Sequence, residues 1–258
     1  MLGAIAGDII GSVHEFRATK SIDFTLFVPE SRFTDDSVLA IAVADCLMTG
    51  KNYVDAFHEY FLEYPNAGYG LRFFHWATAG RRDAYNSFSN GAAMRVPAVG
   101  HAFTTLHEVL AEAARSAEVT HNHSEGIKGA QATAAAIFLA RQGEPKHRIR
   151  DSISAMFGYD LSRSIDEIRP AYEFDESCQG TVPAAMAAFL GSQNYEDAVR
   201  QAISLGGDAD TLACITGAIA EAHYGGLPPH IADGALQLLD DRLRTVVRQF
   251  CERYPVGS

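Results

Sequence analysis

The sequence has 258 residues, of which 47% are hydrophobic and 21% are charged, and its formal net charge is −11. This composition excludes intrinsic disorder, and the negative charge argues against a protein that binds nucleic acid by neutralising phosphates. The length suits a single domain over residues 1–258, with room for a full hydrophobic core.

The first predicted element is an apolar helix over residues 2–13. Gly3, Gly7 and Gly11 lie four residues apart on it, which favours close packing against another helix. Asp8 interrupts it and is costly to bury unless hydrogen-bonded, so we expect a structural carboxylate that caps a neighbouring loop. The segment lacks the basic leader of a signal peptide and is too short for a membrane span. This segment and the four widely spaced cysteines together predict a cytoplasmic protein without a membrane partner.

The second element begins at Thr34-Asp35-Asp36-Ser37 and continues as the apolar helix 38–48. Thr34 suits the N-cap position, and the helix dipole favours each acid in the first turn by ~0.3–1 kcal/mol. Capping alone could therefore explain Thr34, Asp35 and Asp36. It does not explain why two adjacent aspartates lead into a helix that is apolar on nearly every face.

Helical periodicity continues through the rest of the chain, with almost no alternation of the kind that strands show. We expect Ser124 to cap one long helix and Pro183 to lie in the first turn of another. The pattern predicts an all-α bundle of roughly ten or more helices with a small-residue core. The further predicted helices span 52–64, 68–79, 102–117, 124–141, 146–157, 165–168, 178–190, 195–205 and 229–253.

Two polar segments lie between these helices. The stretch Asn90-Gly91-Ala92-Ala93-Met94 exposes backbone N–H groups, a feature that lets a chain approach a phosphate closely. His121 and His123 have a spacing that occurs in zinc sites, but no cysteine or third histidine lies nearby in the sequence. We therefore expect a histidine that contacts ligand or orients a loop.

A second helix start resembles the first. Asp208-x-Asp210-Thr211 follows two glycines and leads into another apolar helix of small residues. If the two starts meet beside Glu15, as many as five carboxylates share one cleft, and like charges that close need cations to stay ionised. Oxygen ligands select Mg²⁺, Mn²⁺ or Ca²⁺ over zinc.

With these residues in view, the sequence resembles the ADP-ribosylglycohydrolases, which include the dinitrogenase reductase-activating glycohydrolase and the ADP-ribosyl-arginine and ADP-ribosyl-serine hydrolases. The matching motifs occur in the family's order over nearly the whole chain. They are Gly3-Ala4-x-x-Gly7-Asp8-x-x-Gly11-Ser12-x-x-Glu15, Phe33-Thr34-Asp35-Asp36-Ser37, Asn90-Gly91-Ala92-Ala93-Met94-Arg95-x-Pro97, Thr120-His121 with Gly129-Ala130, and Gly206-Gly207-Asp208-x-Asp210-Thr211.

The resemblance implies an orthogonal helical fold and a binuclear Mg²⁺ centre, with Mn²⁺ as the alternative metal. The metal ligands that it implies are Thr34, Asp35, Asp36, Asp208, Asp210 and Thr211. The substrate-binding residues that it implies are Ser12, Glu15, Asn90, Gly91, Ala92, Ala93, Met94 and His121. Asp35 or Asp36 is the expected general base, and Glu15 is expected to position the ribose or protonate the leaving group.

The function implied is hydrolysis of the C1″ glycosidic bond that joins ADP-ribose to an acceptor, for which we expect ADP-ribosyl-arginine. The alternative acceptors are serine, O-acetyl esters and nucleobases, the last being the one way in which nucleic acid enters as a partner. An alternative of another class is a non-catalytic ADP-ribose-binding or crystallin-like member. We expect a monomer. Two departures from the family pattern, Ser37 and Ser124, touch no implied ligand.

Overall fold

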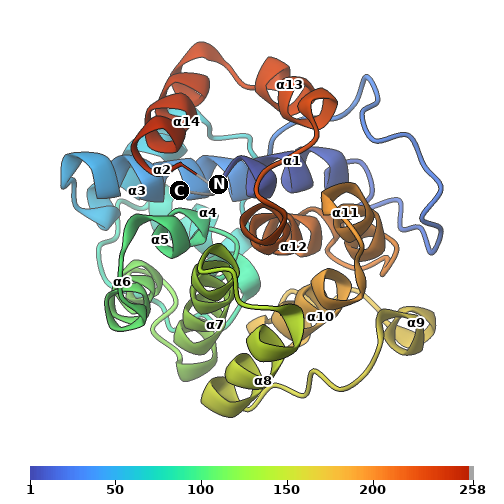
Figure 1. Ribbon diagram of the computed structural model, residues 1–258. Coiled ribbons are helices and arrows are strands. Elements are labelled where there is room, and N and C mark those ends of the chain that lie inside the picture. The colour runs from blue at the N-terminus through green and yellow to red at the C-terminus, as the bar shows by residue number, and fades with distance from the viewer. Residues whose placement is uncertain (256–258) are drawn as a thin grey trace.

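The computed structural model describes residues 1–255, and this part of the chain folds entirely into helices and connecting segments (Figure 1). The predicted all-α class is confirmed, since the only β feature in the described range is an isolated bridge between Ser89 and Ser177. The α-helices are α1 (Leu2–Gly11), α2 (Asp35–Thr49), α3 (Tyr53–Glu63), α4 (Leu71–Thr78), α5 (Pro97–Ala102), α6 (Leu106–Glu118), α7 (Ser124–Arg141), α8 (Lys146–Phe157), α9 (Ile165–Ile168), α10 (Cys178–Gly191), α11 (Tyr195–Ile203), α12 (Ala209–Tyr224), α13 (Pro229–Leu238) and α14 (Asp241–Arg253). Short 3₁₀ helices, η1 and η2, span Asn90–Ala92 and Arg169–Ala171.

The core is organised around α1 and α12, which lie side by side near the centre of the molecule (Figure 1). They run antiparallel, because Gly3 lies against Gly217 and Gly11 lies against Asp210. A Cβ atom on Gly7 would come within 2.1 Å of the backbone oxygen of Ala213, so only glycine permits this approach. The predicted glycine stripe of α1 therefore does pack tightly against another helix.

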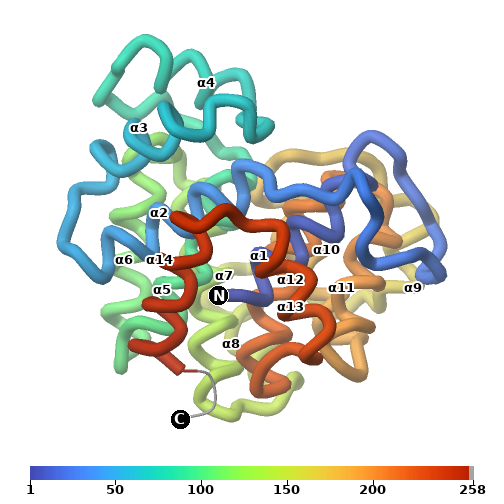
Figure 2. Tube along the Cα trace, turned by 90° about the horizontal axis from the view of Figure 1, so that it is seen from above, coloured from blue at the N-terminus to red at the C-terminus, as the bar shows by residue number. Residues whose placement is uncertain are grey.

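The other helices surround this pair. In Figure 1, α13 and α14 lie above it, α7 and α10 below it, α2 to its left and α11 to its right. The segment between α1 and α2 runs past α11 (Figure 2), and the guanidinium of Arg200 donates to the backbone oxygens of Ile22 at 3.0 Å and Phe24 at 2.7 Å. Within residues 1–255, no helix combines the length and apolar character needed to cross a membrane.

Three local predictions are wrong. The N-cap of α7 is His123, whose Nδ1 accepts from the Glu125 amide at 3.1 Å, and Ser124 is the first helical residue. Pro183 lies inside α10 and not in its first turn, because that helix begins at Cys178 after the N-cap Ser177. The predicted final helix 229–253 is two helices, since Asp240 caps a new one by accepting from the Leu243 amide at 2.9 Å.

Candidate active site

The N-terminal ends of α2 and α12 open into one cavity of about 620 Å³. Its wall contains residues from both helix starts, from the loop after α1, and from the segment around η1. The predicted site residues that line it are Glu15, Thr34, Asp35, Asp36, Asn90, Gly91, Met94, His121, Asp208, Asp210 and Thr211. Segments more than a hundred residues apart in the sequence thus converge on one space.

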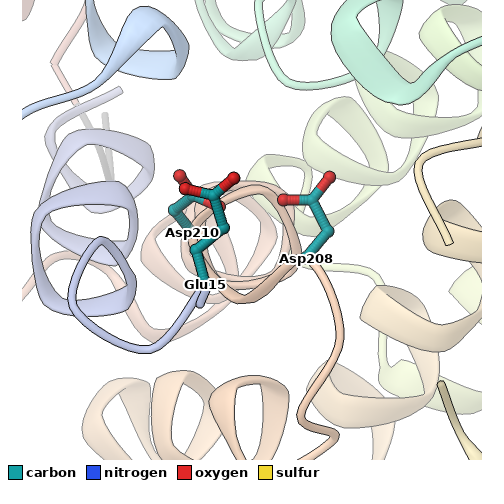
Figure 3. A group of neighbouring side chains, drawn as sticks. All are labelled: Glu15, Asp208 and Asp210. Atoms are coloured by element: carbon teal, nitrogen blue, oxygen red, sulfur yellow. The ribbon is translucent and has the colours of Figure 1, made fainter. Parts of the chain in front are cut away.

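Carboxylates gather in the wall of this cavity. Glu15, Asp208 and Asp210 each offer an oxygen atom, and these atoms all lie within 4.8 Å of one another. Figure 3 shows the three carboxyl groups pointing to the same side, Glu15 from the segment after α1 and the two aspartates from the start of α12. Oxygen atoms at this spacing can share one divalent cation.

The two helix starts also touch directly. The hydroxyl of Thr211 donates to Oδ1 of Asp36 over 3.3 Å, which joins α12 to α2. The other carboxylate oxygen of Asp36, Oδ2, is buried and has no hydrogen-bond partner in the described residues. A buried carboxylate oxygen with nothing to bind is costly, so this atom calls for a cation or a proton.

Asp8 holds the start of α2 in place from α1. Its carboxylate accepts four hydrogen bonds, from the backbone amides of Thr34 (3.0 Å) and Ser37 (3.1 Å) and from the hydroxyls of the same two residues. Asp8 is thus the satisfied, loop-capping carboxylate that the sequence predicts. Thr34 also caps α2 as predicted, because its Oγ1 accepts from the Asp36 amide at 3.2 Å.

Asp208 is oriented from the opposite side of the cavity. The side-chain amide of Asn90 donates to Asp208 Oδ2 at 2.7 Å and to Thr181 Oγ1 at 3.0 Å. The backbone amide of Asn90 donates to the Glu176 oxygen at 2.7 Å, so the start of η1 is anchored to the segment before α10. Asn90 therefore serves the acidic cluster as well as the cavity wall.

The acidic groups strongly perturb one another. Burial, followed by the charges of neighbouring carboxylates, raises the pKa values of Asp35, Asp36 and Asp210 well above the usual range. Glu15 is half-buried, and desolvation and the charge of Asp208 raise its pKa to about 7. Each shift means that the ionised form is disfavoured until positive charge is supplied.

Three predicted substrate-binding residues do not line the cavity. The Ser12 hydroxyl donates to the Ile9 oxygen at 2.9 Å and accepts from the Arg32 amide at 3.2 Å, so it closes the end of α1. Ala92 and Ala93 are completely buried at the end of η1, behind the cavity-lining Gly91. Their small side chains instead allow η1 to pack onto the core.

Sequence reasoning missed much of the cavity wall. Phe16, Phe88 and Phe174 stand at its mouth with exposed fractions of 80%, 45% and 52%, and Ser87 and Ser89 line it next to Asn90. The segment Ser-Phe-Ser immediately before Asn90 was a usable signal, because polar residues that flank an aromatic indicate a partly exposed loop. The phenylalanines by themselves could not be told from core residues by sequence.

Comparisons with known proteins agree with one another. The family model described as ADP-ribosylglycohydrolase matches residues 1–257. The ADP-ribosylhydrolase ARH3 of Bos taurus is 27% identical over 307 residues, covering 87% of this chain and 84% of that protein. The ADP-ribosylarginine hydrolase Tri1 of Pseudomonas putida is 28% identical over 272 residues, covering 89% of this chain and 71% of that protein.

One solved structure shows the same fold. It is described as an ADP-ribosylglycohydrolase-related protein complex and superimposes with a TM-score of 0.68. The match covers 97% of this chain and 96% of that chain, at 24% sequence identity. The arrangement of helices around the acidic cavity therefore has a counterpart among solved structures.

Proposed function

This chain belongs to the ADP-ribosylglycohydrolase family, and from that premise we propose that it removes ADP-ribose from a modified acceptor by metal-dependent hydrolysis of the C1″ glycosidic bond. The observation that carries the proposal is the acidic cluster in the wall of a cavity of about 620 Å³, in which Asp208 and Asp210 would hold a cation and Glu15 lies beside them, outside the proposed ligand set. A cavity of this size accommodates a nucleotide-sized ligand.

The donor set suits two Mg²⁺ ions, or Mn²⁺ in their place. The ligands proposed are all oxygen donors and come from the two helix starts: Thr34, Asp35, Asp36, Asp208, Asp210 and Thr211. The unpartnered Oδ2 of Asp36 supports this choice, since hard cations prefer carboxylate oxygens. When bound at the proposed ligands, such ions would supply Lewis-acid chemistry, orienting the ribose and making water a stronger acid.

The protein's own groups would then divide the acid–base work. Breaking a ribosyl C1″ bond builds positive, oxocarbenium-like character on the sugar, which carboxylates around the ring stabilise. Asp35 or Asp36 would accept the proton of the attacking water. Glu15 comes from a different segment, the loop after α1, and would donate a proton to the leaving group.

The position of Glu15 supports an oxygen-linked acceptor such as serine. An alkoxide is a poor leaving group, so an oxygen-linked acceptor benefits most from a general acid. Glu15 can be that acid, since its oxygen lies within 4.8 Å of those of Asp208 and Asp210 at the start of α12. This proposal moves away from the arginine acceptor that the sequence suggests. Arginine remains the second candidate, because one relative is named an ADP-ribosylarginine hydrolase.

A panel of defined conjugates tests the proposal. Serine-linked, arginine-linked and O-acetyl ADP-ribose are incubated with the protein in Mg²⁺ or with a chelator, and free ADP-ribose is measured. We expect Mg²⁺-dependent release, fastest from the serine conjugate, and a loss of about 10²-fold or more in Glu15→Gln. Glu30→Gln is the matched control, since Glu30 is exposed in the same loop and lies outside the cavity wall.

Other outcomes of the panel would decide against parts of the proposal. Release from the arginine conjugate alone, with Glu15→Gln fully active, would select the arginine candidate. Binding of ADP-ribose without release from any conjugate would indicate a non-catalytic ADP-ribose-binding protein. Undiminished release under rigorous chelation would rule out the metal dependence.

A further inference from the structure

Arg95 is a buried cation that the proposed chemistry leaves without a role. It is completely buried next to η1 and contributes to the cavity wall, and in the described residues no carboxylate lies within ion-pair distance of it. Its guanidinium lies 4.7 Å from the centre of the Phe57 ring, and its Nη2 donates to the backbone oxygens of Ser116 at 3.0 Å and Ala117 at 3.3 Å. These carbonyls end α6, where a helix favours positive charge.

The same nitrogen also begins a chain of polar contacts that ends in the cavity. Nη2 of Arg95 donates to Thr120 Oγ1 at 2.9 Å, and that oxygen lies 2.7 Å from Nδ1 of His121. Nδ1 lies 3.5 Å from Nη2 itself. On the other side of the imidazole, Nε2 lies 2.8 Å from the hydroxyl oxygen of Ser89, which lines the cavity.

The donors and acceptors in the series Arg95, Thr120, His121 and Ser89 determine which nitrogen of the imidazole carries the proton. An arginine only donates, so the Thr120 oxygen accepts from it, and the Thr120 proton is available to Nδ1 or to the Tyr85 hydroxyl, which also contacts Thr120. If Nδ1 of His121 carried the proton, this N–H would point its partial positive charge at the guanidinium of Arg95, which is unfavourable. Nδ1 of His121 is therefore the acceptor, and the proton of the neutral ring lies on Nε2 and is donated to Ser89.

We propose that Arg95 is a positioning residue: through Thr120 it fixes the Nε2–H form of His121, and His121 in turn leaves the Ser89 hydroxyl proton free to donate to an anionic group of the substrate. The anion class expected is a diphosphate, which rests on the proposed function. Before ligand binds, the proton can be donated to Ser87 Oγ, 3.0 Å away.

The surroundings of the ring support a fixed orientation. A Cβ atom on Gly91 would lie 3.2 Å from Nε2 of His121, and one on Gly126 would lie 2.9 Å from its backbone oxygen, so glycines border the residue on two sides. Burial, and then the charges of Arg95 and Arg72, lower the pKa of His121 well below its usual value. The imidazole therefore stays neutral near pH 7.

Nitrogen NMR of protein labelled at its histidines tests the tautomer directly. The spectrum of His121→Asn identifies the His121 signals among the 10 histidines. In the wild type we expect the proton on Nε2 and no protonation between about pH 6 and 8. A proton on Nδ1, or titration near the ordinary histidine pKa, would overturn the proposal.

Variants then test the relay. Thr120→Val removes the hydroxyl, so we expect a mixture of tautomers and an affinity for ADP-ribose about tenfold lower by calorimetry. Thr133→Val is the matched control, because Thr133 is a buried threonine whose hydroxyl has no hydrogen-bond partner within residues 1–255. Unchanged tautomer and affinity in folded Thr120→Val would contradict the relay.

Two more variants separate positioning from simple packing. Arg95→Lys retains the charge and should preserve the Nε2–H form, whereas Arg95→Met should lose it. Ser89→Ala should lower the affinity for ADP-ribose by about tenfold and leave the tautomer unchanged. A wild-type protein with the expected tautomer that binds no ADP-ribose would contradict the proposed function and the anion role of Ser89, but not the role of Arg95.

Discussion

The two ends of the antiparallel pair α1 and α12 each carry a buried acid, but the charges around the two acids differ. At one end Glu221 accepts from the N-terminal ammonium of Met1 and, at 2.9 Å, from the backbone amide of Gly3. At the other end Asp210 shares a cavity wall with further carboxylates, and Asp36 Oδ2 has no partner in the described residues. The fold supplies Glu221, at the compensated end, with a counter-charge, whereas the charges that act on Asp210, at the uncompensated end, are those of Asp208, Asp36 and Glu15.

This difference separates a structural acid from a functional one. Burial of a charge is tolerated where the fold supplies its counter-charge, as it does at Glu221. Several carboxylates that face one another with raised pKa values store unfavourable electrostatic energy. A divalent cation would relieve that energy, so the uncompensated end is the one to which we assign chemistry.

The largest expected effect is on activity at the uncompensated end. Asp210→Asn removes a proposed metal ligand, and we expect turnover of ADP-ribosyl conjugates to fall by about 10³-fold. The protein should remain folded, as circular dichroism would show. Full activity of this variant would contradict the assignment of catalysis to the Asp210 end of the α1–α12 pair.

The compensated end should respond in stability and not in chemistry. Glu221→Gln takes the counter-charge away from the buried Met1 ammonium, and we expect unfolding free energy to fall by about 3 kcal/mol. Denaturant unfolding measures this, with the exposed Glu118→Gln as control. Activity per folded molecule should stay at the wild-type level, and a selective loss of activity would contradict the structural assignment.

The comparison of the two ends also indicates how much the sequence reveals. Thr34 and the aspartates after it could be identified because N-caps and acidic first turns have a local signature. The sequence could not show that Thr211 contacts Asp36, because this contact depends on how α2 and α12 pack; from the sequence, the meeting of the two helix starts could only be assumed. Likeness between the two helix starts, and not any single motif, made the cluster predictable.

Other features needed the structure. The break before α14 depends on Asp240, which caps α14 by accepting from the amide of Leu243. The helical periodicity of the sequence continues across this break and obscured the cap. The sequence around Ser89 indicates an exposed loop, but the proposed role of Ser89 depends on its 2.8 Å contact with His121, which only the structure shows. Local chemistry predicted the capped start of α2 but not those of α7 and α14, and a cavity wall built from distant segments depends on tertiary packing.

A smaller effect is expected from Asp8, which lies between the two ends and acts through Thr34. Asp8→Asn cannot accept the same four hydrogen bonds, so we expect the start of α2 to loosen and Mg²⁺ affinity to fall by about 10- to 100-fold. Calorimetry measures the affinity. Asp45→Asn, on α2 but outside the cavity wall, is the control and should bind Mg²⁺ as the wild type does.

The smallest expected effect has the opposite sign. Burial raises the pKa of Asp36, so at pH above the ordinary carboxyl range its ionised form costs stability in the folded protein. Asp36→Asn removes that charge, and we expect the metal-free protein to gain about 1 kcal/mol of unfolding free energy. Denaturant unfolding in chelator at pH ~8 checks it. A less stable variant would mean that the acids are already compensated.

Direct titration of Mg²⁺ into the metal-free protein by calorimetry tests the central claim that the uncompensated end is a divalent-cation site. The account predicts saturable binding of two ions in the wild type and in Glu221→Gln, with binding weakened or lost in Asp36→Asn and Asp210→Asn. Absence of binding in the wild type, or equal binding in all four proteins, would contradict it.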